Sequence, residues 1–327
     1  QAAAQLGWEE VETDWRRVLA RPDVDIVDIV TPGDSHAAIA IAAAQAGKHV
    51  ICEKPLANSL AEARQMTAAA RQAGVRNMVM FNYRRVPALA FARQLITEGR
   101  LGRIFHYRAQ YLQDWLVDPQ FPRLWRMDKT VAGVGALGDL GAHIADLSLY
   151  LVGRLDRISA CTATMIPTRP LPGEPGKTGP VTVDDCAVFM GRIGETTASY
   201  EVSRLAPGRK NYLALEINGS QGSLRFNLER MNELEFYDRT LPAALQGWNN
   251  IMVTDKSHPY LSHWWPAGHM LGYEHTFVHA MADFLAAVAA GHDLHPDFAD
   301  GAETNAALDA VLRSAASGNW ETVSPVQ

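Results

Sequence analysis

Residues 24–55, VDIVDIVTPGDSHAAIAIAAAQAGKHVICEKP, alternate a strand pattern with a helix pattern. The first seven residues are rich in β-branched side chains and end before Thr31-Pro32, as a short strand does. Residues 34–47 are rich in alanine, begin with N-cap residues and end at a glycine, which predicts a helix. Residues 49–52 predict a second, buried strand, closed by Glu53-Lys54-Pro55. This order, with short connections, indicates two parallel strands joined by a crossover helix.

The same alternation continues to about residue 100. Residues 59–74 begin with a capping box and end at a glycine, residues 77–82 are a short apolar run, and residues 87–99 have a helical pattern. We therefore predict that residues 1–101 form an α/β domain, a parallel sheet with helices on both faces. Ligands of such sheets bind beyond the carboxyl ends of the strands. Those ends lie at residues 31–32, 53–55 and 82–84.

After about residue 102 the pattern changes. Residues 103–113, RIFHYRAQYLQ, alternate with a period near two, which is typical of an antiparallel strand. A helix is predicted at residues 135–151, strand-like runs follow between residues 156 and 238, and helical patterns close the chain after residue 272. We predict that residues 102–327 form an α+β domain with a large, open, mainly antiparallel sheet. An exposed apolar face on that sheet would favour a homodimer or a homotetramer.

The composition excludes several classes of protein. The chain has 327 residues, and its 30 lysines and arginines against 36 aspartates and glutamates give a net charge of −6. Because no basic surplus is present, we expect no nucleic-acid groove and no binding to an anionic membrane, and no apolar run approaches the ~18 residues of a membrane span.

Cys52, Cys161 and Cys186 form neither a disulfide framework nor a zinc motif, which favours a reducing compartment and a cytoplasmic protein. The histidines include no HExxH motif, and we predict no metal site.

Four short motifs occur in order, each at a predicted strand end or in a predicted helix. They are Thr31-Pro32 with His36, Glu53-Lys54-Pro55, Asn82-Tyr83-Arg84, and GDLGAH at residues 138–143. In this order they resemble the glucose-fructose oxidoreductase / inositol dehydrogenase / rhizopine catabolism (Gfo/Idh/MocA) family, and the resemblance covers nearly the whole chain. Residues 264–277 look like a segment of its sugar and cyclitol dehydrogenase branches. The resemblance implies an NAD(P)-dependent dehydrogenase that oxidises a secondary hydroxyl of a sugar, glycoside, anhydrosugar or inositol, or catalyses the reverse reduction.

The sequence departs from the family pattern at its start. Family members open with a strand, a glycine-rich turn of the GxGxxG type and a helix, followed by a second strand that ends in a residue reading the cofactor ribose. Residues 1–7 match the helix after that second strand. We therefore expect a Rossmann-type domain that is incomplete at its N-terminus and lacks the residues that bind the pyrophosphate. The expected cofactor is NAD or NADP, and the expected partner is a small sugar or cyclitol.

Oxidation of an alcohol requires a base for the hydroxyl proton while the hydride leaves to the nicotinamide. A neutral histidine suits this role, and Asp139 and His143 lie one helical turn apart, with Cβ atoms about 6 Å from each other. On spacing alone, a surface ion pair or a packed core histidine would be the simpler interpretation. The order of the motifs, with Lys54 at a strand end, favours catalysis instead. The resemblance implies that His143 is the general acid and base, that Asp139 orients and tunes it, and that Lys54 holds the substrate hydroxyl.

Residues near the strand ends are expected to bind the cofactor. They are Thr31, Pro32, His36, Glu53, Lys54, Asn82 and Arg84. The first three lie on a loop at a helix start, where backbone N–H groups are expected to face the cofactor. By resemblance, Glu53 lies near the nicotinamide, Asn82 bonds its carboxamide or ribose, and Arg84 closes the pocket. Packing, turn and ion-pair roles are the alternatives for these residues.

Aromatic residues are candidates for the sugar pocket, because flat apolar faces suit the C–H faces of a pyranose or cyclitol. The predicted substrate-binding residues are Lys54, Trp115, Trp125, Arg126, Asp139, His143 and Tyr273. The two tryptophans and the arginine precede the predicted catalytic helix, and the tyrosine lies within residues 264–277. A role of the tryptophans in the core or at a subunit interface is the alternative.

Two other functions remain open on the sequence. Some proteins with this fold use tightly held NAD to hydrolyse glycosides by transient oxidation and elimination, and such an enzyme releases an aglycone without net reduction of the nucleotide. A non-catalytic sugar-binding subunit is the second alternative. A titration of the protein with the cofactor distinguishes this subunit from an enzyme, because the enzyme is expected to bind NAD or NADP.

Overall fold

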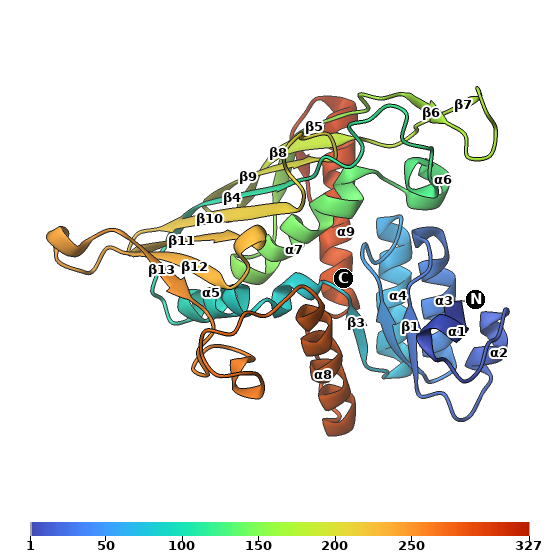
Figure 1. Ribbon diagram of the computed structural model, residues 1–327, viewed down its shortest axis with the longest axis horizontal. Helices are drawn as coiled ribbons and strands as arrows, with labels where there is room; N and C mark the ends of the chain where they lie inside the picture. The colour runs from blue at the N-terminus through green and yellow to red at the C-terminus, as the bar shows by residue number, and fades with distance from the viewer. Residues whose placement is uncertain (1, 327) are drawn as a thin grey trace.

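The computed structural model describes residues 2–326, and its N-terminal part is built on a three-stranded parallel sheet in the order β1-β2-β3 (Figure 1). The strands are β1 (Ile26–Ile29), β2 (His49–Cys52) and β3 (Asn77–Val79). The helices are α1 (Ala2–Leu6), α2 (Trp15–Leu19), α3 (His36–Gln45) and α4 (Leu60–Ala73). The predicted alternation of parallel strands and helices is confirmed. Of the predicted segment 1–7, residue 1 lies outside the described residues.

Local signals explain where α4 begins and ends. The Ser59 hydroxyl accepts a hydrogen bond from the backbone N–H of Glu62 at 3.2 Å, and this satisfies a donor of the first turn. Gly74 ends the helix with φ of 66°, a left-handed conformation that glycine adopts without steric cost.

The rest of the chain is organised around a nine-stranded sheet in the order β13-β12-β11-β10-β4-β9-β8-β5-β14. Neighbouring strands are antiparallel except for β4 and β9, which run parallel, so the prediction of a mainly antiparallel sheet is confirmed. The strands are β4 (Ile104–Leu112), β5 (Arg157–Ala163), β8 (Cys186–Ile193), β9 (Thr196–Ser203), β10 (Tyr212–Gly219), β11 (Gly222–Asn227), β12 (Glu233–Asp238), β13 (Trp248–Met252) and β14 (Glu321–Thr322). A separate hairpin is formed by β6 (Thr168–Pro170) and β7 (Thr178–Pro180).

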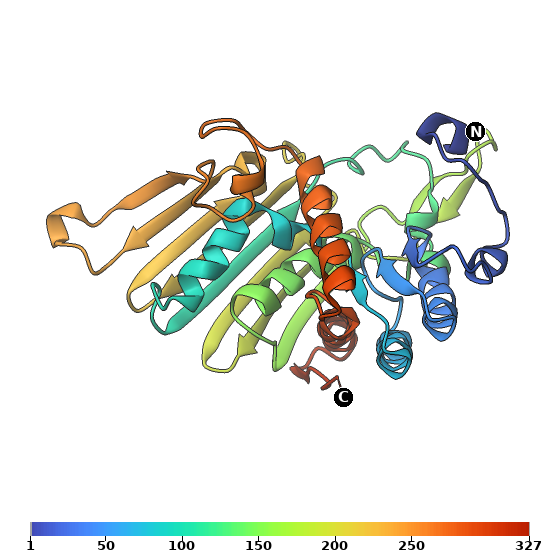
Figure 2. The same cartoon turned by 90° about the horizontal axis from the view of Figure 1, so that it is seen from below.

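Helices cover one face of the large sheet and leave the other face open (Figures 1 and 2). The covering helices are α5 (Pro87–Thr97), α7 (Ala142–Leu151) and α9 (Phe298–Ser317), and α6 (Lys129–Ala132) and α8 (Glu274–Ala290) lie elsewhere. Buried and partly exposed residues therefore alternate along strands such as β11 and β12, and every second side chain is buried against the helices. A π-helical turn at Leu137–Gly141 leads directly into α7.

The helices cross between the two parts of the chain. Ile51 and Met78 of the parallel sheet pack against Ala280 and Phe284 of α8, a helix more than two hundred residues away in sequence from β2. α9 packs against α4 and β3 on one side and against β5 on the other. α5, which we had placed over the parallel sheet, instead packs against α7, β11 and β12. Therefore α8 and α9 join the two sheets into one body, with the strand ends of the small sheet facing α7.

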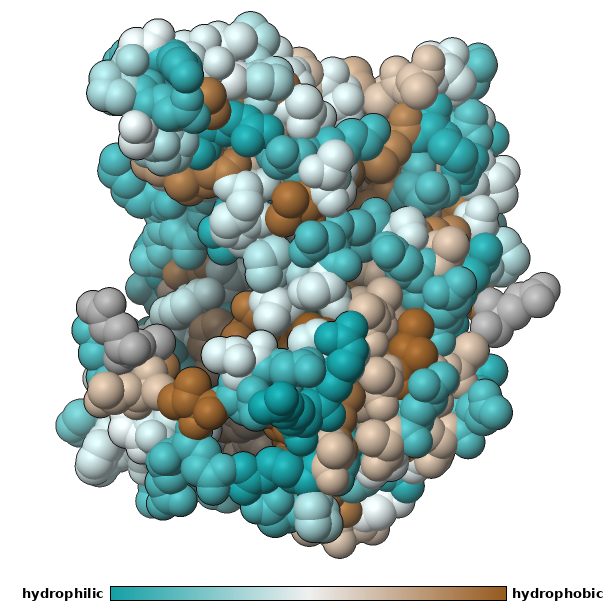
Figure 3. All heavy atoms as spheres, turned by 90° about the vertical axis from the view of Figure 1, so that its right-hand side faces the viewer, coloured by the Kyte–Doolittle hydropathy of each residue, from teal (hydrophilic) through white to brown (hydrophobic). Residues whose placement is uncertain are grey.

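The side of the molecule that carries α1 to α4 mixes hydrophilic and apolar side chains (Figure 3). Over the described range, the helices are each too short or too polar to cross a membrane.

Candidate active site

Two adjoining cavities lie beyond the carboxyl ends of the parallel strands, where ligands of such sheets bind. The smaller has a volume of about 210 Å³ and the larger about 360 Å³. Glu53, Lys54 and Asp139 line both cavities, so these side chains stand between them. The smaller cavity is also lined by Asn82, Tyr83, Tyr111, Gln113, His143, Asn211 and Tyr273. The site is thus assembled from both sheets and from the start of α7.

His143 lies in the first turn of α7 and faces the smaller cavity. Its ring centroid lies 4.4 Å from that of Tyr83 and 5.9 Å from that of Tyr111. Burial lowers the pKa of the imidazole well below its usual value, the Lys54 charge lowers it further, and the Asp139 charge opposes both effects. His143 is therefore neutral at neutral pH, the state that a general base requires.

Asp139 is held between two cations. Its Oδ1 accepts a hydrogen bond from Lys54 Nζ at 2.9 Å, and its Oδ2 accepts one from Arg204 Nη2 at 3.0 Å. Lys54 Nζ also donates to the Asp139 carbonyl oxygen at 2.8 Å. Burial raises the pKa of the Asp139 carboxyl, but the charges of Lys54 and Arg204 outweigh burial and hold it below its usual range. The ionised carboxylate therefore fixes the ammonium group of Lys54 beside both cavities.

The role expected for Asp139 is corrected in one respect. We expected its carboxylate to orient the His143 ring, one α-helical turn further on. Residues Leu137–Gly141 form a π-helical turn, and the side chains of Asp139 and His143 both border the smaller cavity. The carboxylate oxygens bind Lys54 and Arg204, and Asp139 acts on His143 through its charge.

Asp184 anchors the π-helical turn. Its carboxylate accepts hydrogen bonds from the backbone N–H groups of Gly135 and Leu137, both at 2.7 Å. A Cβ atom at position 135 would lie 1.9 Å from the Asp184 carbonyl oxygen, so the close approach requires glycine. The segment before β8 thus positions the helix start that carries Asp139 and His143. No motif in the sequence pointed to Asp184.

A hydrogen-bonded chain of polar side chains forms the wall beside His143. The Tyr83 and Tyr111 hydroxyls lie 2.7 Å apart, and Tyr111 donates to Asn211 Oδ1 at 2.7 Å. Gln113 Nε2 donates to the same oxygen at 2.9 Å. The Tyr111 hydroxyl has one proton and donates it to Asn211, so Tyr83 is the donor in its bond with Tyr111. Because Asn211 Oδ1 accepts both bonds, the N–H groups of the Asn211 amide remain available to the cavity. Burial raises the pKa of both tyrosines, so both hydroxyls are neutral at neutral pH.

Sequence reasoning missed this wall and Arg204. Tyr83 lies within the quoted Asn82-Tyr83-Arg84 motif, and Tyr111 lies in the alternating strand, so both carried a weak signal. Nothing local distinguishes Asn211 or Arg204, because only the sheet pairing of β4, β9 and β10 brings them to the site.

Most of the residues predicted to bind the cofactor line the larger cavity. They are Thr31, His36, Glu53 and Lys54, accompanied by Trp125 and Arg126, which were predicted to bind substrate. The His36 ring is held by backbone carbonyls, with Nε2 at 2.8 Å from the Thr31 oxygen. Asn82 lines the smaller cavity and donates to the Thr276 hydroxyl at 2.9 Å, and Tyr273 lines the same cavity. The individual roles of these residues stay predictions.

Three predicted residues line neither cavity. Arg84 is buried and pairs with Asp146, with Nε–Oδ2 and Nη2–Oδ1 distances of 2.9 and 2.6 Å. Trp115 packs edge-on against Phe121 and donates its indole N–H to Gln113, behind the cavity wall. Pro32 precedes the turn at Gly33–Ser35 without facing the cavity. Arg84 therefore stabilises the junction between the two sheets rather than closing the pocket.

The larger cavity suits the nicotinamide half of a dinucleotide. It offers the cationic groups of Lys54 and Arg126 beside the Thr31 loop, and these donors match carboxamide and ribose oxygens. Gly33 also lines the larger cavity. A Cβ atom at this position would lie 2.5 Å from Asn58 Oδ1, so the Gly33 backbone lies close to the Asn58 side chain. The residues present thus fit the cofactor that the sequence predicts.

Comparison with known proteins identifies the family of this chain. A family model for oxidoreductases with an NAD-binding Rossmann fold matches residues 1–81, and the GFO/IDH/MocA C-terminal domain matches residues 89–225. Levoglucosan dehydrogenase of Pseudarthrobacter phenanthrenivorans is 42% identical over 99% of this chain and 86% of its own length. The structure of an oxidoreductase domain protein from Kribbella flavida is 51% identical, with a TM-score of 0.96 over 99% of this chain and 87% of its own.

A structure of levoglucosan dehydrogenase in complex with NADH and levoglucosan has a TM-score of 0.95 and 43% identity, and it covers 99% of this chain and 86% of its own. The fold class and the enzyme class predicted from the sequence are confirmed. The chain belongs to the Gfo/Idh/MocA family of NAD(P)-dependent oxidoreductases that act on CH–OH groups.

Proposed function

We propose that this protein oxidises one ring hydroxyl of an anhydrosugar of the levoglucosan type, with NAD as the hydride acceptor. The observation that carries the proposal is the 210 Å³ cavity, where neutral His143 and the Lys54 ammonium face polar side chains of the second sheet. A cavity of this size is small beside the ~300–1,000 Å³ pockets of larger ligands, which suits a single sugar ring. The similarity to a levoglucosan dehydrogenase over most of both chains supports the same substrate class.

Each group of the site has a task in the proposed reaction. The substrate hydroxyl gives its proton to His143 while Lys54 donates a hydrogen bond to the same oxygen, which stabilises its developing negative charge. Asp139 keeps the ammonium in place, and the amide of Asn211 offers donors to another sugar oxygen. When bound, NAD supplies the acceptor for the hydride of the same carbon. The protein contributes by holding the reacting groups in position.

A substrate comparison tests the proposal. The full-length protein is assayed with NAD or NADP and with levoglucosan, D-glucose, D-xylose or scyllo-inositol, and the absorbance of reduced nicotinamide is followed. D-glucose is the matched control, because it differs from levoglucosan by the opened bridge. We expect kcat/KM with levoglucosan and NAD to exceed that of every other pair by at least ~10-fold. A preference for another of these compounds, or conversion of levoglucosan to D-glucose without net reduction of the nucleotide, would contradict the proposal.

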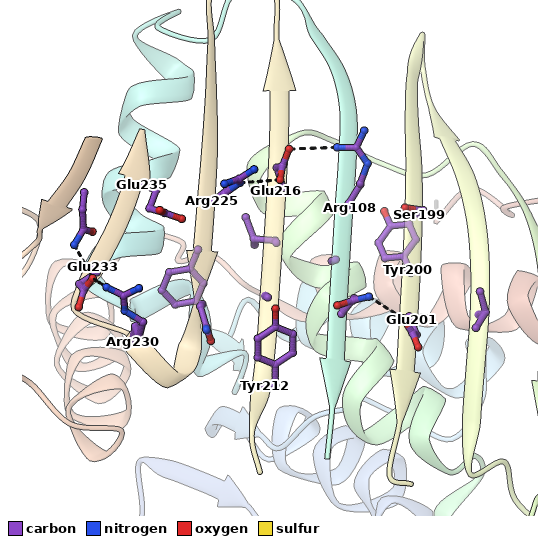
Figure 4. A pocket seen from close by; sticks show the side chains of 18 residues that line it. Arg108, Ser199, Tyr200, Glu201, Tyr212, Glu216, Arg225, Arg230, Glu233 and Glu235 are labelled. Atoms are coloured by element: carbon purple, nitrogen blue, oxygen red, sulfur yellow. Dashed lines mark hydrogen bonds and ion pairs between the residues drawn. The ribbon is translucent and has the colours of Figure 1, made fainter. Parts of the chain in front are cut away.

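We propose further that the open face of the large sheet is the contact between copies of this chain. That face has a hollow of about 570 Å³, crossed by the row Arg108, Glu216 and Arg225 (Figure 4). Glu216 lies 3.5 Å from Arg108 and 2.9 Å from Arg225. Beside this row, Val188 and Met190 on β8 are 50% and 52% exposed. Exposed apolar side chains beside a row of charges are a surface that two copies of the chain can bury across a two-fold axis.

Light scattering coupled to size exclusion measures this contact. The wild-type protein is expected to have the mass of a dimer or tetramer, and the double variant V188E/M190E that of one chain, because two added carboxylates cannot be buried unpaired. The matched control is Leu285→Glu, at a residue of α8 that is also 50% exposed, and it should leave the mass unchanged. A monomeric wild type, or an unchanged mass in the double variant, would refute the contact.

A further inference from the structure

Arg204 occupies an unusual position for a charged residue. It directly follows β9, is 2% exposed and lines the larger cavity. Its backbone is held on both sides, because its N–H donates to the Asp185 carbonyl at 3.0 Å and its carbonyl accepts from Leu116 at 3.3 Å. The side chain therefore approaches Asp139 from a rigid strand end. Its guanidinium carbon also lies 5.6 Å from the centre of the Trp115 ring.

Two cations contact the single carboxylate of Asp139. Lys54 and Arg204 each bring one positive charge to it, at 2.9 and 3.0 Å, so these three contacting groups together carry a net charge of about +1. Two further carboxyl groups lie nearby without joining this contact: Asp184, on which the Arg204 charge acts, binds the backbone N–H groups of Gly135 and Leu137, and Glu53 lines both cavities. Within the described part of the chain, Arg204 Nε has no hydrogen-bond partner although it is buried. A buried and incompletely paired cation destabilises a fold. Unlike other buried arginines, Arg204 borders the cavity that fits the nicotinamide, so its charge acts close to the reacting groups.

We propose that Arg204 is the positioning residue of the reaction: it binds the second oxygen of Asp139, so that Asp139 orients Lys54 without neutralising it. If Lys54 were the only partner of Asp139, the two charges would cancel, and the ammonium would stabilise a developing alkoxide less. With Arg204 present, the surplus charge acts on the substrate oxygen in the transition state. The inference rests on the dehydrogenase activity and does not depend on which sugar is oxidised.

Three replacements separate the charge of Arg204 from its hydrogen bond. In Arg204→Met both are lost, Arg204→Gln keeps a donor without the charge, and Arg204→Lys keeps the charge. We expect the Met and Gln variants to lose ~10- to 100-fold in kcat with little change in KM, because the lost stabilisation exists only in the transition state. The Lys variant should recover most of the kcat. Kinetic assays use whichever substrate the wild-type enzyme turns over best, so a failed anhydrosugar proposal leaves this test intact.

Arg169 is the matched control for a purely structural arginine. It is 0% exposed, its Nε also lacks a partner within residues 2–326, and it binds the carbonyl oxygens of Leu116 and Asp118 away from both cavities. Arg169→Met should lower the melting temperature and leave kcat nearly unchanged. The Arg204 variants should instead lower kcat and raise the deuterium isotope effect on kcat, since hydride transfer becomes slower relative to the other steps.

A double-mutant cycle and a binding assay complete the test. In an Asp139→Asn background, Arg204→Met should cause little further loss, because its effect passes through Asp139. The Kd for NADH, measured by fluorescence, should not change, and a crystal structure of Arg204→Met should show Lys54 and Asp139 closed into a simple pair. Independent, multiplicative losses, a loss confined to KM or to NADH binding, or a wild-type kcat in Arg204→Gln would each overturn the proposal.

Discussion

Replacing His143 by alanine is expected to lower kcat for alcohol oxidation by at least ~100-fold, because the variant loses the group that takes the hydroxyl proton. The imidazole borders the 210 Å³ cavity, and burial together with the Lys54 charge keeps it neutral. The Kd for NADH should change little, since His143 does not line the 360 Å³ cavity. Steady-state kinetics and quenching of tryptophan fluorescence by NADH measure the two quantities.

The matched control is His292→Ala, at an exposed histidine after α8, which should retain wild-type kinetics. The pH profile gives a second readout. Catalysis needs the neutral imidazole, and its pKa lies below the usual value, so wild-type kcat/KM should hold as pH falls to about 6.5 and decline only below it. Near-normal turnover of His143→Ala would remove this residue from the mechanism.

Replacing Lys54 by methionine is expected to lower kcat by ~100- to 1,000-fold, the loss typical of a donor to a developing oxyanion. The side chain stands between both cavities and is fixed by the Asp139 carboxylate and carbonyl at 2.9 and 2.8 Å. Lys54→Arg should remain strongly impaired, because a guanidinium nitrogen has at most two N–H groups, and these two contacts would leave none for the substrate oxygen. Rates of formation of reduced nicotinamide, with the sugar at saturation, measure the effect.

Lys256→Met is the control for this variant, since Lys256 is exposed and far from the parallel sheet in sequence. It should show unchanged kcat and KM. If Lys54→Met raised KM alone and left kcat intact, Lys54 would only bind the substrate, because an equal contribution to ground and transition state does not change turnover.

The elements that sequence predicted best are those with strong local signals. The capping box at Ser59 and the alternating pattern of residues 103–113 correspond to the start of α4 and to β4. The motif residues Lys54, Asp139 and His143 meet in one site, as their order along the chain suggested. The expected contact between Asp139 and His143 is replaced by two ion pairs, because Lys54 and Arg204 bind the carboxylate oxygens of Asp139.

Hydrophobic periodicity, caps and short motifs therefore sufficed for the class of both sheets, the enzyme family and the three residues that meet in the candidate site. These signals depend on residues that are close together in the chain, so they can be recognised in the amino-acid sequence without a structure. The partners of those residues depended on contacts between distant segments. Arg204 and Asn211 reach the site only because β9 and β10 flank β4, and α8 covers β2 only after the chain has completed the large sheet. Such contacts form when buried surface and charge pairing are satisfied across the whole molecule, which no local pattern records.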